Sequence, residues 1–496
     1  MLVGVVGFGA ARLAMLPGLG FWDTAELQAV APLLGTAHPT GYPTYVLLGW
    51  LVNVVLTPLG EPAFRMNLFA ALSLGVAAAV TADLARALTR STALGVLAGL
   101  GLALTEVAWA IGTQADAHAL HLVLVAVLLR LLVAWEDRAD RPDRDRYLVA
   151  AAVVFGLAVG NHSLTLLLAP PIALYVLAVD PATLGRPRLI ATCASALVVT
   201  VVLVFLELPL RAGPFRAPLV YGHPETWDGF WYIVLAEQFR ESVVGPFADL
   251  PAKAAEVVRQ AISAFGPLTA LIVIAYAATG IRRPTYALLT GVGSLLTCAF
   301  AASYDNAEIQ RYYLGPILFA WTWLAILAAA VGEYLGTATA DEADGPSSPP
   351  PRPILAAGLA AALLIPTAVS LPDRLARVDR STDHAARDWV DGALGVMAPD
   401  ALVVSWWSYS TPLWYAQHIE GQRPDLTVVD DRTRLDQGLG DVTDVIEANL
   451  TKRPVYVIRV DPIEIAMLDR RYILDPVVPG DPSLLMRVVS RREAGG

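Results

Sequence analysis

Long apolar stretches alternate with short polar ones from Met1 to about Leu371. The apolar runs are about 18–23 residues long, enough to cross the ~30 Å hydrocarbon core of a bilayer. They predict a polytopic α-helical membrane protein with about 11 transmembrane helices. We place these helices at residues 2–19, 66–88, 92–110, 117–135, 147–160, 163–179, 189–208, 257–280, 284–302, 313–335 and 354–371. The shorter run Thr44–Pro58 favours a helix lying along the membrane surface.

The pattern changes after Pro372, where charges become frequent and apolar runs short. Three runs are typical of buried strands, and helix-like stretches separate them, which predicts a small α/β domain. The strands are "ALVVS" (401–405), "LTVVD" (426–430) and "PVYVIRV" (454–460), and the helices are 384–396, 410–419 and 442–450. The acidic, then Pro/Ser-rich segment before the last membrane helix predicts a flexible linker. We therefore divide the chain into a membrane domain with the candidate site (1–335), a linker (336–353), a last transmembrane helix (354–371) and an α/β domain (372–496).

Composition agrees with membrane insertion. The chain is 56 % hydrophobic and only 16 % charged, whereas soluble domains carry roughly 25 % charged residues. The net charge of −10 argues against a nucleic-acid partner. Cys193 and Cys298 both fall in predicted spans, so no disulfide framework is indicated. The first apolar run lacks a basic start and an A-x-A site, so we interpret it as an uncleaved span, with Arg12 inside it.

Arginines gather in alternate loops, which predicts the orientation because basic loops stay cytoplasmic. The basic loops carry Arg86, Arg90, Arg138, Arg141, Arg144, Arg146, Arg186, Arg188, Arg282 and Arg283. The remaining loops, and the α/β domain, are then extracytoplasmic, in a multi-pass protein of the cell membrane. Unusual polar residues collect on that outer side. Ionisable groups at membrane depth are costly and usually mark a site.

The stretch "FWDTAELQAVAPLLGTAHPTGYP" (21–43) supplies the first candidates. Asp23 and Glu26 lie at i and i+3, hence on one face of a helix, and a partly desolvated carboxylate can act as a general base. The alternative is a capping device, with Asp23 as N-cap and Glu26 at N3. His38 sits in a turn made rigid by Pro39 and Pro43, where it would contact substrate or cap the next helix.

Three more polar clusters are candidates. In "TQADAHALH" (113–121), Gln114, Asp116 and His118 could line one cavity, while a metal site is disfavoured because i and i+2 face apart on a helix. In "GNHS" (160–163), Asn161 and His162 would contact substrate or simply form a tight turn. In "YDNAEIQRYY" (304–313), Arg311 is a plausible phosphate clamp, whereas Tyr312 and Tyr313 favour an interfacial aromatic belt.

Two aromatic stretches complete the candidates. Residues 227–240 are amphipathic and predict a helix on the membrane surface, which could also wall a lipid entrance. "SWWSYSTPLWY" (405–415) follows the first predicted strand of the α/β domain, at the end where α/β sheets gather their sites. It suits a sugar or peptide surface, or core packing and docking. No G-x-G-x-x-G or P-loop is present, which disfavours nucleotide binding in this domain.

The ordered motifs "WDTAEL", "AHPTGYPTYVLLG", "FRMNL", "QADAHAL" and "GLAVGNHSLTLLL" resemble a bacterial membrane family related to eukaryotic protein O-mannosyltransferases. The resemblance covers roughly residues 20–170 and implies a GT-C-type glycosyltransferase fold. It also implies transfer of a sugar from a polyprenyl-phosphate carrier, in the outer leaflet, to a protein, lipid or glycan acceptor. Asp116 stands where the family has Glu, and His118 where it has Tyr, so the sugar stays open, with mannose among the candidates.

The resemblance also implies roles for residues. Asp23 would be the catalytic base and Glu26 a supporting acid, while His38, Tyr42, Arg65 and Asn67 would shape the donor site. Arg65 or Arg311 would neutralise the leaving phosphate in an inverting single displacement. No cofactor is implied, and metal dependence stays open. The competing interpretations are a transporter or flippase for a lipid-linked sugar, against which no internal repeat is visible, and a scaffold that presents the α/β domain.

Overall fold

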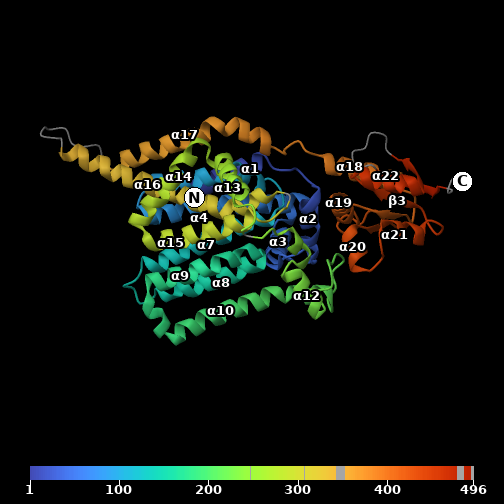
Figure 1. The fold of residues 1–496 in the computed structure, drawn as a ribbon, viewed down its shortest axis with the longest axis horizontal. Coiled ribbons are helices and arrows are strands. Elements are labelled where there is room, and N and C mark those ends of the chain that lie inside the picture. The colour runs from blue at the N-terminus through green and yellow to red at the C-terminus, as the bar shows by residue number, and fades with distance from the viewer. Residues whose placement is uncertain (246, 307, 342–351, 478–484, 493–496) are drawn as a thin grey trace. The chain divides into compact units, whose positions relative to one another are not determined.

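The structure, a computed structural model, describes residues 1–245, 247–306, 308–341, 352–477 and 485–492. It is mostly helical, with a small sheet formed near the C-terminus (Figure 1). Within the described residues, seven helical segments are long and apolar enough to cross a membrane, and four shorter apolar helices accompany them. The chain is therefore a multi-pass membrane protein, as its hydrophobic pattern predicts.

The described chain packs as two compact units. The first unit, here called the helical unit, contains Met1–Met15, Leu68–Leu206 and Leu235–Arg380. The second, here called the mixed unit, contains Leu16–Asn67, Glu207–Val234 and Ser381–Gly496. Three separate stretches of sequence thus build the mixed unit, and two of them come from between predicted spans. The division of the chain near residues 335 and 372 stays a prediction.

The helical unit is an assembly of long apolar helices. In chain order its α-helices are α1 (Leu2–Leu13), most of α4 (Pro62–Thr89), α5 (Thr92–Ala103), α6 (Glu106–Ile111), α7 (Ala117–Glu136), α8 (Asp145–Asn161), α9 (Ala169–Val179), α10 (Pro187–Phe205), α13 (Leu250–Phe265), α14 (Thr269–Arg282), α15 (Pro284–Ala301), α16 (Leu314–Asp341) and α17 (Arg352–Val378). Short 3₁₀ turns join several of them, including η2 (Ser163–Leu168), η3 (Pro181–Gly185), η5 (Gly266–Leu268) and η6 (Ile309–Tyr313).

Three predicted spans differ from the helices observed. The first helix ends at Leu13 rather than at residue 19, just before a segment that contains Pro17, Gly18 and Gly20. The predicted helix at 92–110 is broken between α5 and α6, and the span predicted at 257–280 is two helices that meet at Gly266. Gly266 has φ +55°, and Pro267 follows it. Both residues interrupt a regular helix, whereas hydrophobicity alone registers a continuous run.

Close helix contacts in this unit depend on small residues. A Cβ on Gly101 of α5 would lie 2.5 Å from the ring of Trp321, which belongs to α16. The Trp321 indole N–H donates to Thr105 Oγ1 at 3.0 Å, and the Trp323 indole N–H donates to Thr290 Oγ1 at 2.9 Å. Buried indole N–H groups require such partners in an apolar interior. Small residues and hydroxyls therefore fix how α5 and α15 pack on α16.

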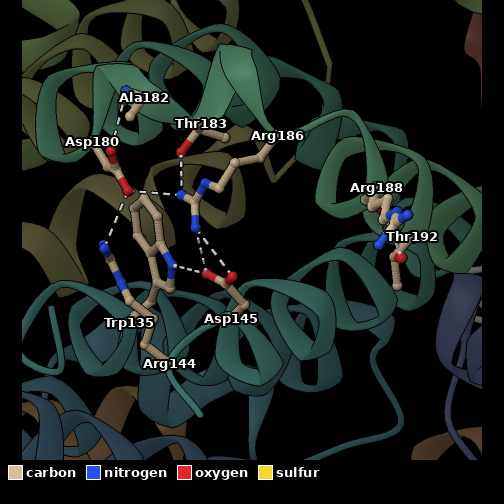
Figure 2. Close-up of polar contacts among 9 residues, drawn as sticks. All are labelled: Trp135, Arg144, Asp145, Asp180, Ala182, Thr183, Arg186, Arg188 and Thr192. Carbon is tan, nitrogen blue, oxygen red and sulfur yellow. Dashed lines mark hydrogen bonds and ion pairs between the residues drawn. The ribbon is translucent and has the colours of Figure 1, made fainter. Parts of the chain in front are cut away.

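Arginines at one end of α8 and α10 form an ion-pair network (Figure 2). Arg186 bonds both Asp145 and Asp180, and Arg144 bonds Asp180 at 3.1 Å. The Arg144 guanidinium also lies 4.5 Å from the centroid of the Trp135 ring. These residues come from two of the basic loops that predict the orientation. Part of the positive charge of these two loops is therefore neutralised by ion pairs that hold helix ends together.

The mixed unit begins with two short helices joined by a tight turn. These are α2 (Trp22–Leu33) and α3 (Pro43–Val55), which begins with proline, a favoured first residue of a helix. In the turn, Gly41 has φ +81°, and a Cβ there would lie 3.1 Å from both Ile233 and Leu208. Glycine is needed at this position for both reasons. The helices α11 (Glu207–Ala212) and α12 (Trp227–Val234) belong to the same unit.

The C-terminal residues form a five-stranded sheet of order β2-β1-β3-β5-β4. The strands β1 (Leu402–Val404), β2 (Thr427–Val429) and β3 (Val455–Ile458) are parallel, and β4 (Tyr472–Pro476) and β5 (Leu485–Arg491) pair antiparallel. The helices are α18 (Ala385–Val396), α19 (Trp407–His418), α20 (Asp431–Asp436), α21 (Val442–Asn449) and α22 (Pro462–Arg471). The predicted strands and helices are thus present, and β4, β5, α20 and α22 were not predicted.

Both faces of the sheet are covered. Alternate side chains point to opposite faces of a strand, so Val403 and Tyr456 join one apolar cluster while Val404 and Val457 join another. The first cluster also contains Ala25 and Ala29 of α2. Helix α2 therefore packs on the α/β domain within the mixed unit, and this packing positions the candidate site.

The predicted linker is only partly described. Residues 336–341 continue α16, and Arg352 begins α17. Helix α16 therefore continues for six residues past the predicted start of the linker, and the linker itself stays a prediction. The part of the predicted linker at 342–351 lies outside the described residues.

Candidate functional site

The acid pair lies in the first turns of α2, as predicted, but not as a capping box. The N-cap of α2 is Phe21, and no side chain caps this end of the helix. Asp23 and Glu26 are therefore inside the helix, where they share one face. The capping alternative for Asp23 is wrong, since the helix begins two residues earlier than that alternative requires.

Glu26 holds the turn that carries His38. The Glu26 side chain is almost fully buried, and its Oε1 accepts the His38 backbone N–H at 2.7 Å. Its Oε2 bonds the Nδ1 of the same histidine. On the other side of the ring, Tyr42 Oη lies 3.1 Å from Nε2. His38 does not cap α3, whose N-cap is Tyr42, so that alternative is wrong.

The electrostatics of this pair favour the imidazolium. Burial lowers the pKa of His38, but the charges of Glu26 and Asp23 and the hydrogen bond to Glu26 raise it further than burial lowers it. The net result is a pKa above the ordinary value of a histidine. The imidazole of His38, with its raised pKa, thus lies beside two carboxylates.

Asp23 receives a donor from the α/β domain. The Trp407 indole N–H donates to Asp23 Oδ1 at 2.9 Å. In the described part of the chain, the other carboxylate oxygen of Asp23 has no hydrogen-bond partner. One oxygen is held in place while the second is free to take a proton.

Aromatic rings and an arginine surround the acids. The Trp407 ring lies 5.9 Å from His38, 6.0 Å from Tyr221 and 5.8 Å from Trp414, centroid to centroid. The guanidinium of Arg432 lies 5.9 Å from the Trp407 and Tyr221 ring centroids. Trp407, Trp414 and Arg432 all come from the α/β domain. The α/β domain therefore contributes side chains to the wall of the candidate site, in addition to packing against α2.

Asp23, Glu26 and His38 could also hold a metal ion. One ligand atom from each lies within 4.8 Å of the others. Carboxylate and imidazole form a donor set that suits a divalent transition metal. However, Glu26 and His38 Nδ1 bond each other directly, and Asp23 accepts from Trp407. Glu26 and His38 Nδ1 are therefore already paired, whereas one oxygen of Asp23 has no partner among the described residues.

Two other predicted donor-site residues make internal bonds. Arg65 Nη1 donates to the Asn53 backbone oxygen at 2.8 Å and to Thr57 Oγ1 at 3.0 Å. Asn67 Nδ2 donates to the Leu16 and Gly18 backbone oxygens, both at 2.9 Å. Both side chains are buried. Their hydrogen bonds hold α3 and the segment that precedes α2 in place. They therefore stabilise the backbone near the acid pair rather than contact substrate.

The helical unit holds a second polar cluster around Asp116. Asp116 is the N-cap of α7, only 3 % exposed, and its Oδ1 accepts the His118 N–H at 2.7 Å and lies 2.9 Å from His118 Nδ1. Because Asp116 is extended rather than helical, the two side chains meet. The expectation that they face apart was therefore wrong. Arg311 bonds Asp116 Oδ2 at 3.1 Å and also pairs with Glu308.

Charge keeps Asp116 ionised. Burial raises the pKa of Asp116, but Arg311 and the charge and hydrogen bonds of His118 lower it more, so the pKa lies below its usual value. A cavity of about 160 Å³ is lined by residues that include Gln114, Asp116, Glu308 and Arg311. Three of the predicted substrate-binding residues thus share one cavity.

Asn161 and His162 lie where α8 ends. Asn161 Nδ2 donates to the Ala117 backbone oxygen at 3.0 Å, and His162 Nδ1 accepts from the Leu164 N–H at 3.1 Å. The His162 ring lies 4.8 Å from His118 and 5.5 Å from Tyr312. The GNHS motif therefore does form a turn, as one of the two interpretations predicts. The same turn brings His162 beside the Asp116 cluster.

The sequence reasoning missed several residues of these clusters. Tyr312 contacts both His118 and His162, and Tyr313 is only 2 % exposed. The prediction of an interfacial aromatic belt was therefore wrong for Tyr313, and for Tyr312 it stays a prediction. Trp407 and Arg432 were not singled out, although "SWWSYSTPLWY" was noted as a site. Their partners Asp23 and Tyr221 lie hundreds of residues away in the sequence. Only the position of Trp407 just after a parallel strand indicates a site residue.

Comparison with known proteins supports the resemblance. Residues 23–184 match the sequence family described as the protein O-mannosyl-transferase TMEM260 N-terminal domain. The chain is 26 % identical over 435 residues to protein O-mannosyl-transferase TMEM260 of Mus musculus, which covers 84 % of this chain and 59 % of the mouse protein. The predicted resemblance is confirmed. The chain spans less than two thirds of the mouse protein's length.

The fold is shared with solved glycosyltransferases. ArnT from Cupriavidus metallidurans, bound to undecaprenyl phosphate, is similar with a TM-score of 0.58 at 15 % identity over 98 % of this chain and 97 % of that chain. The Archaeoglobus fulgidus oligosaccharyltransferase, in complex with Zn and sulfate, has a TM-score of 0.57 at 14 % identity over 97 % and 70 %. These are GT-C glycosyltransferases. The predicted fold class, a GT-C-like membrane protein with a small α/β domain, is confirmed.

Proposed function

We propose that this chain is an integral-membrane glycosyltransferase that moves a sugar from a polyprenyl-phosphate carrier to an extracytoplasmic acceptor. Mannose is the first sugar to test, because the matched sequence family is named for O-mannosyl transfer. One observation carries the proposal: Asp23 has one oxygen fixed by Trp407 and the other without a partner in the described residues, beside the Glu26–His38 pair.

The proposed reaction is a single displacement at the anomeric carbon. The acceptor hydroxyl gives its proton to the free oxygen of Asp23, and its oxygen forms a bond to the anomeric carbon. The bond from that carbon to the phosphate oxygen breaks, and the electron pair leaves with the polyprenyl phosphate. Attack opposite the leaving group inverts the anomeric configuration. Proton transfer of this kind contributes typically about 10²–10⁴-fold.

Glu26, His38 and Tyr42 support Asp23 in this proposal. Glu26 fixes the His38 turn through two bonds, and Tyr42 holds the far side of the imidazole. The resulting cation lies beside the carboxylate that takes the proton. Arg65 and Asn67 act indirectly, by holding the backbone on which the acids are mounted.

Within the helical unit, the Asp116 cluster suits a phosphate ligand. Arg311 is paired with the buried Asp116 and with Glu308, whose side chain is 49 % exposed. A phosphate oxygen could replace the exposed partner while Asp116 keeps the guanidinium in place. His118 and His162 contact the ring of Tyr312, Gln114 lines the same cavity as Arg311, and Asn161 fixes the backbone at Ala117. Arginine suits phosphate because its planar fork donates two parallel hydrogen bonds.

A lipid-linked donor cannot leave the membrane, so the enzyme must be embedded in it. The apolar helices and the carriers bound by similar structures fit such a donor: undecaprenyl phosphate in ArnT, and dolichol phosphate in the archaeal oligosaccharyltransferase AglB, which also holds an inhibitory peptide. The distribution of arginines among the loops favours an extracytoplasmic position for the acid pair and the α/β domain.

Glycosyl transfer by the purified protein in detergent tests the proposal. Labelled polyprenyl-phosphate mannose is supplied with candidate acceptors, and released or transferred label is measured in wild type, Asp23→Asn and Asp228→Asn. The wild type and the Asp228→Asn control, changed at an aspartate of α12, should turn the donor over, and Asp23→Asn should not. Detergent abolishes any gradient. Saturable binding without turnover in every protein would instead indicate a transporter.

A further inference from the structure

A polar cavity in the mixed unit has no role in the chemistry above. Its volume is about 220 Å³, and its wall includes Glu26, Thr36, Tyr221, Trp414, Asp430 and Asp436. It lies at the carboxyl end of strand β2, because Asp430 directly follows that strand. Ligand sites of α/β sheets gather at this edge. Since Glu26 lines it, the cavity reaches the acid pair.

Asp430 carries an unused acceptor. The residue is 1 % exposed, and one of its oxygens accepts the Thr433 N–H at 2.7 Å at the start of α20. Among the described residues, its Oδ2 is buried and has no hydrogen-bond partner. A buried oxygen without a partner is costly, by ≈ 1–3 kcal/mol or more for a charged group. An oxygen of this kind in a cavity wall indicates a ligand that donates to it.

Asp436 and the Arg432–Tyr221 pair add further polar groups to the cavity wall. Asp436 Oδ2 accepts the Gly222 N–H at 3.2 Å, and Arg432 donates to Tyr221 Oη at 2.6 Å. Burial raises the pKa of both Asp430 and Asp436, more than their hydrogen bonds lower it. The carboxyl groups accept hydrogen bonds, and the Arg216 and Arg432 guanidiniums of the same wall can donate them. Hydroxyl-rich ligands require both kinds of partner.

We propose that this cavity binds the sugar ring of the donor, with Asp430 accepting from a ring hydroxyl. The proposal rests on the glycosyltransferase function above and deepens it. Three observations support it: acceptors and donors on several walls, the Trp414 ring for the apolar face of a sugar, and the size. A volume of about 220 Å³ is below the ≈ 300–1,000 Å³ of sites for larger ligands, and suits one ring.

The same chemistry disfavours other parts of the substrates. A polyprenyl chain would leave the carboxyl oxygens and the Arg216 and Arg432 guanidiniums of this wall without partners. An acceptor hydroxyl presents a single O–H group, whereas the wall offers Asp430, Asp436 and Thr433. A monosaccharide presents several hydroxyls at once, and so satisfies more of these groups than any other part of donor or acceptor.

The test compares two ligands that differ only in the sugar. Competition against labelled donor gives the affinities of the full-length protein for polyprenyl-phosphate mannose and for bare polyprenyl phosphate. In the wild type the loaded carrier should bind more tightly. Asp430→Asn should reduce this preference about tenfold or more, the effect of losing one hydrogen bond to a charged group, and leave binding of the bare carrier unchanged.

Two further variants keep the result unambiguous. Asp441→Asn changes an exposed N-cap aspartate of α21 in the same domain, so it controls for loss of a helix cap and should keep the preference. Gln437→Ala changes an exposed residue of the cavity wall whose side chain makes no hydrogen bond among the described residues. It should reduce the preference even if Asp430→Asn does not fold.

The outcomes separate the two proposals. If the wild type transfers sugar while Asp430→Asn and Gln437→Ala keep the full preference for the loaded carrier, the cavity proposal alone is wrong. If the variants bind both carriers equally weakly, the cavity contacts the lipid phosphate rather than the sugar, which also overturns it. If the wild type neither transfers sugar nor prefers the loaded carrier, both proposals are wrong.

Discussion

The carboxylate of Asp23 is held by a side chain 384 positions later in the sequence. Trp407 donates to one oxygen and so decides which oxygen remains for the acceptor. On the other side, Glu26 and His38 share a hydrogen bond that keeps a positive charge beside that acid. At the scale of single residues, the site is a carboxylate base. Trp407 sets its orientation, and the Glu26–His38 pair sets the charge beside it.

Removing the Trp407 donor should misplace the base. We expect Trp407→Phe, which keeps an aromatic ring, to lower kcat/KM by about tenfold or more, because a hydrogen bond to a charged group contributes ≈ 1.5–3 kcal/mol. The measurement is steady-state transfer of labelled sugar. Trp406→Phe is the matched control, since its indole N–H makes no hydrogen bond among the described residues, and it should stay near the wild-type rate.

The raised pKa of His38 predicts how stability depends on pH. An imidazole whose pKa is higher in the folded state stabilises that state below its unfolded pKa of about 6.5, and this contribution is lost as pH rises through the folded value. Wild type should therefore exceed His38→Gln in free energy of unfolding most at pH below about 6.5. Thermal unfolding across pH checks this, and a difference that grows with rising pH would contradict it.

The turn between α2 and α3 is the element on which His38 depends. It begins where Thr36 N–H donates to the Leu219 backbone oxygen at 3.2 Å, and ends at Pro43. The Gly41 N–H donates to the His38 backbone oxygen at 2.7 Å and closes the turn. The geometry of His38 is therefore set by backbone bonds and by Glu26, not by the helix that follows.

A side chain at Gly41 should open this turn. Gly41→Ala meets both a positive φ and contacts at 3.1 Å, so we expect it to destabilise the protein by about 1–3 kcal/mol and to lower transfer. Gly392→Ala is the control, because a Cβ there meets nothing within 4 Å, and in helix α18 it should be neutral or stabilising. Equal unfolding temperatures for the two variants would refute the expectation.

Elements with strong local patterns could be predicted, and others could not. The apolar runs at β1 and β3 are continuous because these strands are buried on both faces, and the edge strand β2 is partly buried. Strand β4 is partly exposed, with burial that does not alternate cleanly, and gave no such signal. Likewise the broken helix at Gly266 was hidden by continuous hydrophobicity on both sides of it.

For the whole molecule, the sequence predicted the membrane class, the α/β domain and the acid pair, because each depends on short-range pattern. It could not predict that residues 16–67, 207–234 and 381–496 pack as one unit. Packing across such separations is decided by tertiary contacts, among them the Thr411 Oγ1 bond to the Trp22 backbone oxygen at 2.8 Å. For the same reason Trp407, Arg432 and Asp430 escaped residue-level prediction.

The assembled site should work without a metal ion. Glu26 and His38 bond each other, one Asp23 oxygen accepts from Trp407, and the raised pKa of His38 favours a positive charge beside the acids. We therefore expect the rate of transfer to be unchanged by EDTA followed by gel filtration. A loss of activity that added Mn²⁺ or Mg²⁺ restores would contradict this and would assign the three side chains as ligands.

The central claim is that Asp23 takes the proton of the acceptor. Single-turnover transfer with donor already bound tests it most directly, since donor binding and chemistry are then measured separately. We predict that Asp23→Asn binds polyprenyl-phosphate mannose as tightly as the wild type and transfers the sugar at least about 10²-fold more slowly. Transfer by Asp23→Asn at the wild-type rate, from donor shown to be bound, would contradict the assignment of the base.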